Sequence, residues 1–318
     1  MPRKSGVCIV TTTKNAGPAL DTFIEYHLRV GIRKIYLFFD DASDPNFDRT
    51  KRYAEVRGIC VGRKLMQLWK QTRTYRGGLT DLKQTFTRQS LNTEIAIGWA
   101  MADNLAWILH LDDDELFYSK KSILEHFDEQ PPSVGQITYV NFEGAPETFQ
   151  IRNIFKDVSL FKRNCFFDGH YRLNVLGPKR KQLERQLRRP TFYLGYGSGK
   201  SAARLVPGLL PFSGHEFVDV KRYKNRFFSF ADPCILHFNM CGYANYLNKV
   251  ENWAYNLYQQ PNETILSRSR AAYLAGDTAR LRAIYRNEIM YSPKSGEVTG
   301  LRDAKLLFRL PKLRQLLP

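Results

Sequence analysis

Four consecutive acidic residues follow an apolar run in the segment Trp107–Phe117, WILHLDDDELF. The apolar run predicts a buried strand, and because side chains alternate along a strand, Asp112 and Asp114 should point the same way at its carboxyl end. Two carboxylates held that close repel each other unless a cation or a proton lies between them. Oxygen ligands of this kind suit Mg²⁺ or Mn²⁺, above all an ion that also binds substrate phosphates. The alternative is a solvated acidic turn or a helix N-terminus, whose dipole favours carboxylates.

The elements that must position these acids predict a parallel sheet. Strands are expected at Val7–Thr13, Lys34–Phe39 and Arg57–Val61, with a helix between Pro18 and Gly31 and a second helix around residues 95–102. Alternation of strands and helices is typical of α/β folds. We therefore expect a mixed, mostly parallel sheet that is flanked by helices.

Polar clusters fall at the ends of three of the predicted strands. They are Thr11–Asn15, Asp40–Asp44 and Asp112–Glu115. Active sites of parallel sheets lie at the carboxyl ends of the strands. The coincidence of the three clusters predicts a site at that edge of the sheet.

The second half of the chain has a different pattern. After Gln136 the predicted strands are short, namely QITYVNF, TFQIRNIF, SLFKR and PTFYLGY. From Gly242 to Arg286 the chain is predicted to be helical, with Tyr246, Val250, Trp253 and Leu257 on one face. The tail from Leu301 either packs as a helix broken at Pro311 or lies on a membrane surface. We expect residues 1–135 and 136–240 to be two halves of one domain, and residues 241–318 to be a helical C-terminal region.

The charge balance favours an anionic partner. The chain has 318 residues, and 48 Lys and Arg against 31 Asp and Glu give 48 − 31 = +17. Nucleic acid, an acidic membrane face or a phosphorylated substrate would suit this charge. The segment Lys179–Arg189 is a basic helical stretch whose simplest interpretation is a solvated helix or loop. No nucleic-acid-binding motif accompanies it, so no specific nucleic acid is expected.

The cysteines and the hydropathy favour a cytosolic protein. Peripheral contact with a membrane surface is a further expectation. The five cysteines are odd in number and scattered, without zinc-binding spacing, and we expect most of them to be reduced thiols in the core. No run approaches the roughly 18 apolar residues of a membrane span. The first predicted strand begins at Val7, which leaves no room for a signal peptide.

The glycine-rich segment Gly195–Ser201, GYGSGKS, is not a P-loop. A P-loop needs glycine where Leu194 stands, five residues before the glycine of GK. Lys200 could still contact a phosphate as a point charge. An ordinary surface lysine after a turn is the alternative.

Three histidines are weaker candidates for function. His237 has mostly apolar neighbours, which favours a core residue over a ligand. His110 precedes the acids and is expected on the other face of their strand. His215 stands beside Glu216 after a loop rich in Pro and Gly, and is expected near a cleft.

The chain resembles GT-A-fold glycosyltransferases, in particular those of family 92 and related family 2 enzymes. The resemblance covers about residues 7–260 and rests on segments in the family's order. They are Phe23–Asp44, Trp107–Phe117, Gly199–Ser201, His215, and His237-Phe238 with Lys249. The chain departs from the family at Asn141–Gly144 and in the basic insert Lys179–Arg189. Both departures would lie toward the acceptor, so they leave the acceptor open.

The resemblance implies a GT-A-type, Rossmann-like fold and a metal-dependent transfer of a sugar from a nucleotide-sugar. The donor would be a UDP-hexose such as UDP-galactose, the acceptor a glycan or another hydroxyl, and the metal Mn²⁺ or Mg²⁺. Residues 1–135 would bind the donor and 136–240 the acceptor. The implied donor-binding residues are Thr11, Lys14, Asn15, Asp41, Arg88, Asp112 and Lys200, and the implied metal ligands are Asp112, Asp114 and His237.

Inversion at the anomeric carbon requires a carboxylate that deprotonates the acceptor hydroxyl. Glu216 is the first candidate for this base and Glu143 the second. An ordinary surface acid is the alternative for each of them.

Two other functions remain open from the sequence. A nucleotidyltransferase shares the parallel sheet and the carboxylate-bound metal, but its first loop is usually glycine-rich and basic, and Thr11–Asn15 has one Lys and no glycine pair. The other alternative is a basic protein that binds nucleic acid or membranes and in which the acid cluster is structural. The charge favours it, whereas the clustering of polar residues at strand ends does not.

Overall fold

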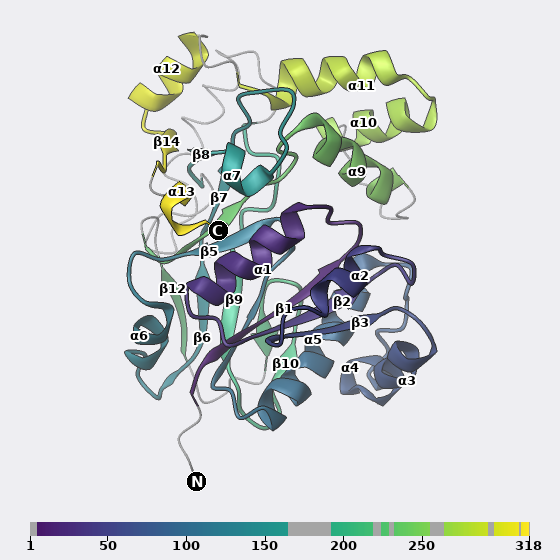
Figure 1. Ribbon diagram of the computed structural model, residues 1–318, viewed down its shortest axis with the longest axis vertical. Coiled ribbons are helices and arrows are strands. Elements are labelled where there is room, and N and C mark those ends of the chain that lie inside the picture. The colour runs from purple at the N-terminus through teal and green to yellow at the C-terminus, as the bar shows by residue number, and fades with distance from the viewer. Residues whose placement is uncertain are drawn as a thin grey trace. The chain divides into compact units, whose positions relative to one another are not determined.

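The computed structural model describes residues 5–164, 192–218, 224–228, 232–254, 264–291, 296–311 and 313–317. The basic run Lys179–Arg189 and Cys165 lie outside these residues. The contacts divide the chain into two compact units (Figure 1). Unit 1 comprises residues 1–140 and 199–235, and unit 2 comprises residues 141–198 and 236–317. The domain boundaries expected at residues 135 and 240 stay a prediction.

Unit 1 is built on a seven-stranded sheet with the strand order β12-β6-β9-β4-β1-β2-β3. Its strands are β1 (Val7–Thr13), β2 (Lys34–Phe39), β3 (Val56–Cys60), β4 (Trp107–His110), β6 (Val134–Tyr139), β9 (Lys200–Arg204) and β12 (Lys224–Phe228). Pairings β1–β2, β1–β4, β2–β3 and β6–β12 are parallel, whereas β9 is antiparallel to β4 and to β6. The predicted fold class, a mixed α/β fold with a mostly parallel sheet, is therefore confirmed.

Helices cover the sheet of unit 1, with α1 on the near side in Figure 1. The helices are α1 (Ala19–Arg29), α2 (Asn46–Thr50), α3 (Arg63–Gln71), α4 (Arg73–Arg76), α5 (Thr85–Ala102) and α6 (Ile123–Asp128). Alternate residues of the strands, such as Val10, Phe38 and Ile108, form one core cluster with residues of α3 and α5. The alternation of a strand thus gives each face of the sheet its own helical layer.

The remaining elements of unit 1 are short. They are β5 (Glu115–Tyr118) and the hairpin strands β10 (Leu210–Pro211) and β11 (Phe217–Val218); β13 (Cys234–His237) begins in unit 1 and ends in unit 2. A buried histidine fastens α1 to β5. His27 Nδ1 donates to Phe23 O at 2.8 Å, while His27 Nε2 accepts the backbone N–H of Phe117 at 3.2 Å.

Unit 2 combines a small antiparallel sheet with helices. Its elements are β7 (Asn141–Gly144), α7 (Ile154–Asp157), β8 (Leu160–Lys162), α9 (Tyr243–Ala254), α10 (Ile265–Leu274), α11 (Thr278–Ile284), the π-helix η1 (Tyr285–Ile289), α12 (Gly296–Asp303), β14 (Leu307–Arg309) and α13 (Leu313–Leu316). Strand β8 pairs with β7 and with β14. The predicted helical region from Gly242 is present, and Tyr246 and Val250 are buried in it.

Several local predictions for the second half were wrong. The segment QITYVNF is divided between β6 and β7, and TFQIRNIF is a loop with the short helix α7. The described part of PTFYLGY, residues 192–196, has no strand. Trp253 is 42% exposed and does not share the buried face of Tyr246. In the tail, Leu307 belongs to a strand, and Leu313 and Leu317 are buried.

In the part of the chain that the structure describes, no helix combines the length and the apolar character that crossing a membrane requires. The described cysteines are all free thiols: Cys8, Cys234 and Cys241 are buried, and Cys60 is half-buried.

Candidate active site

The three polar clusters predicted at strand ends meet at one edge of the sheet in unit 1. Strand β1 lies between β2 and β4, with Thr13 opposite Phe39 and Val10 opposite His110. The backbone N–H of Asp40 donates to Thr13 O at 2.8 Å, and the Thr13 hydroxyl donates to the carboxylate of Asp113. The ends of β1, β2 and β4 are thereby joined to one another.

The cation beside the acid cluster is a lysine of this chain. Lys200 Nζ lies 2.7 Å from Asp112 Oδ2 and 3.6 Å from Glu115 Oε2. The Lys200 side chain is 1% exposed, so the alternative of a surface lysine is wrong. The other oxygen of Asp112, Oδ1, accepts a hydrogen bond from Gln89 Nε2 at 3.0 Å. Sequence reasoning did not find Gln89, because nothing in its helical context marks it.

The charges of this pair stabilise each other. Burial disfavours the ionised carboxyl of Asp112, but the Lys200 ammonium, which also donates a hydrogen bond, and His110 together outweigh burial and lower the Asp112 pKa to about 2. Burial likewise disfavours the ammonium of Lys200, yet the carboxylates of Asp112 and Glu115 raise its pKa above the ordinary value. Both groups therefore stay charged at neutral pH.

The glycine before Lys200 explains how this lysine reaches the acids. Lys200 is the first residue of β9 and lies opposite Tyr139 of β6. Gly199 has φ = 75°, and a Cβ there would overlap the carbonyl oxygen of Tyr139. Only glycine fits this close approach of two backbones. The GKS segment thus contains the start of β9, and it places the Lys200 side chain beside Asp112.

The expectation that His110 lies on the face opposite the acids was wrong. Leu111 stands between His110 and Asp112, so the two share a side of the chain. His110 Nδ1 donates to Gly214 O, and Lys200 Nζ donates to the same oxygen at 3.3 Å. Burial lowers the pKa of His110 to about 3, so the ring is neutral.

The hairpin of β10 and β11 carries the first candidate base. Its tip is held by the two bonds to Gly214 O and by His215 Nδ1, which donates to Gly199 O at 2.7 Å. Glu216 follows His215, and its side chain is exposed. An exposed carboxylate thus stands two residues from the carbonyl that Lys200 contacts.

The loops after β1 and β2 hold most of the residues implied in donor binding. Lys14 and Asn15 are exposed, and the backbone N–H of Asn15, which has φ = 55°, donates to Asp44 Oδ2 at 2.7 Å. The carboxylate of Asp41 accepts from the N–H and hydroxyl of Ser43, which hold the Asp41 pKa below its ordinary value. Asp44 is a supporting residue that sequence reasoning did not single out.

Two of the implied donor-binding residues are less accessible. Thr11 is fully buried within β1, and its hydroxyl has no hydrogen-bond partner among the described residues. Arg88 forms a two-pronged ion pair with Asp40, with Nε 2.9 Å from Oδ1 and Nη2 2.6 Å from Oδ2. A third nitrogen of Arg88 donates to Leu82 O at 2.6 Å. This arginine fixes the end of β2 in the described structure.

Glu143, the second candidate base, is a buried structural ion in unit 2. It is 0% exposed and pairs with Lys162, which is 1% exposed. Its carboxylate also accepts the backbone N–H groups of Leu194, at 2.9 Å, and Gly195, at 2.5 Å. Burial disfavours the Lys162 ammonium, but Glu143 raises its pKa. A carboxylate held in this way is poorly suited to abstract a substrate proton.

His237 is a buried residue of unit 2, as the apolar context predicted. It is 4% exposed, and its ring lies 5.0 Å from that of Tyr196 between centroids. Asp112 and Asp114 belong to unit 1, and the three-residue metal set stays a prediction. Within the described ranges, no three His, Cys, Asp or Glu side chains are grouped so that they could hold a metal ion.

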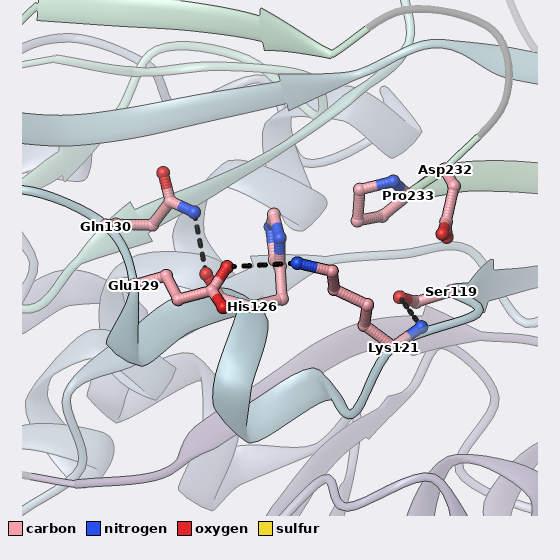
Figure 2. A pocket seen from close by; sticks show the side chains of 7 residues that line it. All are labelled: Ser119, Lys121, His126, Glu129, Gln130, Asp232 and Pro233. Carbon is pink, nitrogen blue, oxygen red and sulfur yellow. Dashed lines mark hydrogen bonds and ion pairs between the residues drawn. The ribbon is translucent and has the colours of Figure 1, made fainter.

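Unit 1 also has a polar hollow of about 270 Å³. Figure 2 shows the side chains that line it. Lys121 and Glu129 form an ion pair of 3.5 Å across it, and Asp232 borders it. None of the residues predicted from the sequence lines this hollow.

Two curated proteins of Arabidopsis thaliana are similar to this chain. Glycosyltransferase-like At2g41451 is 30% identical over an alignment of 258 residues, which covers 76% of this chain and 55% of that protein. Glycosyltransferase-like At3g57200 is 26% identical in an alignment that covers 95% of this chain and 61% of that protein. The chain therefore spans 55–61% of the length of these relatives. No family model matches the chain.

Solved structures give a weaker likeness. Residues 1–349 of S. aureus TarS match with a TM-score of 0.34 and 10% identity, over 88% of this chain and 73% of that one. Core-mannan synthase A of Aspergillus fumigatus, in its Mn/GDP form, matches with a TM-score of 0.31 and 10% identity, over 63% and 60%. At these scores the likeness supports no conclusion about site or substrate. The names of the curated relatives agree with the glycosyltransferase resemblance that the sequence motifs indicated.

Proposed function

We propose that this protein transfers a hexose from a nucleotide-sugar donor, in particular a UDP-hexose such as UDP-galactose, to a hydroxyl group of a glycan acceptor. The observation that carries the proposal is the meeting of three polar strand ends around the Asp112–Lys200 pair. Similarity over 258 residues to a protein named glycosyltransferase-like supports it. The edge formed by the carboxyl ends of parallel strands is where α/β proteins bind such ligands.

The loops after β1 and β2 would hold the nucleoside. Lys14 and Asn15 are exposed there, and Asp41 on the neighbouring loop is half-buried, with a carboxylate kept ionised by Ser43 and Lys14. A carboxylate is an acceptor suited to ribose hydroxyls. Thr11 and Arg88 would support these loops from within, because Thr11 is buried in β1 and Arg88 is bonded to Asp40.

The carboxylate oxygens of the acid cluster are ligands that suit a divalent ion. Asp112 stays ionised, and the charge of Asp114 opposes that ionisation, which means that the two carboxylates interact. Mg²⁺ and Mn²⁺ are usually bound by one or two carboxylates together with substrate phosphates. Asp112 and Asp114 of unit 1 would hold the ion. When bound, it would neutralise charge on the leaving diphosphate as a Lewis acid.

The transfer would proceed by inversion with Glu216 as the base. Its carboxylate takes the proton of the acceptor hydroxyl while that oxygen forms a bond to the anomeric carbon. The bond from the anomeric carbon to the diphosphate oxygen breaks, and the nucleoside diphosphate leaves with the bonding electron pair. Lys200 contacts both Asp112 and Glu115, and it would hold these two acids in position during the reaction.

The direct test is nucleotide release. The protein with Mn²⁺ and a panel of UDP-, GDP- and CDP-hexoses should liberate UDP from a UDP-hexose, slowly to water and faster with a glycan acceptor. Chelation of the metal should stop this release. Liberation of pyrophosphate from UTP and a sugar phosphate would instead identify a nucleotidyltransferase. Binding to polyanions without any nucleotide release would favour the basic binding protein.

The place of the protein in the cell is also part of the proposal. The cytosolic location is proposed from the scattered cysteines, and the peripheral contact with an anionic membrane from the net charge of +17. Co-sedimentation with vesicles of anionic and of neutral lipids at two salt concentrations would test it, because electrostatic contact weakens with salt.

A further inference from the structure

The outer face of the hairpin in unit 1 combines an exposed aromatic ring with a carboxylate. Strands β10 and β11 are antiparallel, with Pro211 opposite Phe217. Both of these residues are buried, so they form the inner face. The next residues toward the tip are Phe212 and Glu216, and the N–H of Phe212 donates to Glu216 O at 2.9 Å. Because faces alternate along a strand, Phe212 and Glu216 lie together on the outer face.

Phe212 is unusually exposed for a phenylalanine. Its exposed fraction is 69%, and Val218 on the same hairpin is 37% exposed. A single exposed apolar residue needs no explanation, whereas several that gather beside a candidate site point to a ligand.

A second exposed ring stands beside the same hairpin. Phe86, in the first turn of α5, is 48% exposed. Helix α5 packs against β10, and Gln89, one turn after Phe86, has its Oε1 3.1 Å from where a Cβ of Gly214 would stand. Phe86 thus lies in the first turn of the helix that packs against this hairpin.

The tip of this hairpin is bonded to Lys200 and His110 beside the acid cluster. The carbonyl of Gly214 accepts from Lys200 Nζ at 3.3 Å, and Lys200 contacts Asp112 at 2.7 Å. His110 donates to the same carbonyl. The hairpin that carries Phe212 and Glu216 is thus fastened, at its tip, to the residues of the acid cluster.

We propose that Phe212 and Glu216 bind the acceptor and that the acceptor is a pyranose, whose apolar face stacks on the Phe212 ring while a hydroxyl donates to the Glu216 carboxylate. This assignment rests on the proposed function and names its acceptor class. The electron-rich face of an aromatic ring attracts the C–H groups on one face of a pyranose, and contact removes apolar area from water. An ionised carboxylate only accepts hydrogen bonds, which suits a sugar hydroxyl.

The charge of the hairpin disfavours a polyanion as its ligand. The segment 210–218 contains Glu216 and no Lys or Arg. A nucleic acid or an acidic lipid headgroup would be repelled by the carboxylate and would find no cation in this segment. A neutral sugar meets neither obstacle.

Saccharide binding tests the assignment without any need for activity. Saturation-transfer NMR would be recorded with methyl glycosides of galactose, glucose, mannose and N-acetylglucosamine, at millimolar concentration, on the wild type and three variants. The variants are Phe212→Ala, Phe212→Trp, which keeps an aromatic face, and Leu274→Ala as the matched control. Leu274 is 56% exposed and belongs to α10 of unit 2. Thermal melting would check that each variant folds.

The wild type, Phe212→Trp and Leu274→Ala should bind at least one glycoside, with saturation strongest at the C–H protons of one sugar face. Phe212→Ala should bind it about tenfold more weakly, which corresponds to about 1.4 kcal/mol. No glycoside binding by the folded wild type, or equal affinity in Phe212→Ala, would overturn the assignment. UDP release by the wild type tests the proposed function separately. Glycoside binding that depends on Phe212, without any UDP release, would support the saccharide-binding surface and contradict the proposed transferase activity.

Discussion

Lys200 Nζ lies 2.7 Å from Asp112 Oδ2, although the two residues are 88 positions apart in the chain. The lysine side chain is 1% exposed and that of Asp112 is 27% exposed. Lys200 therefore supplies, from within the protein, part of the positive charge that offsets the repulsion among Asp112, Asp114 and Glu115. It also connects the stability of unit 1 with the arrangement of its candidate site.

Loss of this lysine should destabilise the protein. In Lys200→Met the carboxylates of Asp112 and Glu115 lose their ammonium partner, and breaking a buried pair in this way typically costs about 3–5 kcal/mol. Urea unfolding at pH 7 would measure the change. The matched control is Lys51→Met, because the ion pair of Lys51 with Asp48 is exposed on both sides and contributes little. Equal unfolding midpoints for the two variants would contradict the importance of the Lys200 pair.

Removal of the charge of Asp114 should stop sugar transfer. Asp114→Asn is expected to lower UDP release at least a hundredfold and to abolish the effect of Mn²⁺ on melting temperature, because one of two proposed oxygen ligands loses its charge. Asp112→Asn should also be inactive, but it should be less stable, since Lys200 then lacks its closest carboxylate. The control is Asp128→Asn in α6, an exposed acid outside the strand ends. Full activity of Asp114→Asn would reject the metal site.

The nucleotide should be recognised by its base. UDP with Mn²⁺ is expected to raise the melting temperature, whereas GDP with Mn²⁺ should not. Ligand linkage gives about 2.7 kcal/mol at a hundredfold excess over Kd, which a thermal shift resolves easily. UDP with a chelator serves as the control for the metal. Equal shifts for UDP and GDP would leave the choice of a uridine donor without support.

The two candidate bases should behave differently when neutralised. Glu216→Gln should abolish transfer and leave the melting temperature unchanged, because this side chain is exposed. Glu143→Gln should destabilise the protein by about 3–5 kcal/mol, since it leaves the buried Lys162 ammonium without its partner. Activity assays and urea unfolding on both variants separate the roles. A stable but inactive Glu143→Gln beside an active Glu216→Gln would reverse the assignment.

Acid should destabilise the protein through His27. Burial lowers the pKa of His27 from its ordinary value of 6.5 to about 3, although the bond to Phe23 O acts in the opposite direction. Between pH 6.5 and 3 the unfolded chain binds a proton at this ring and the folded chain does not, so the free energy of unfolding falls as the pH falls. The contribution is about 1.4 kcal/mol for each pH unit.

Urea unfolding between pH 7 and 5 would measure this dependence. His27→Gln removes the titrating ring, so its stability should be lower at pH 7 but should decline less steeply toward acid than that of the wild type. An identical slope in the variant would show that His27 is not a source of the acid sensitivity.

The sequence by itself determined the first strands and the main helices between them in unit 1, and the edge of the sheet at which the candidate site lies. Apolar runs of the right length placed β1 at Val7–Thr13 and β2 at Lys34–Phe39 with the bounds that the structure has. The order of strands and helices then implied parallel pairing, and parallel pairing alone brings the ends of β1, β2 and β4 together. These are properties of neighbouring residues and of chain direction, which a sequence displays.

Only the tertiary structure decided which side chains meet. Strand β9 enters the sheet antiparallel between β4 and β6, and this places Lys200 against Asp112 rather than on the surface. Chain folding likewise buries Glu143 against Lys162, whereas Glu216 stays exposed on a hairpin. Local patterns report the period and polarity of a segment but not its neighbour in the sheet. The charge state and exposure of each candidate depend on that neighbour, because burial and opposite charge, not residue type, set the free energy of an ionised group.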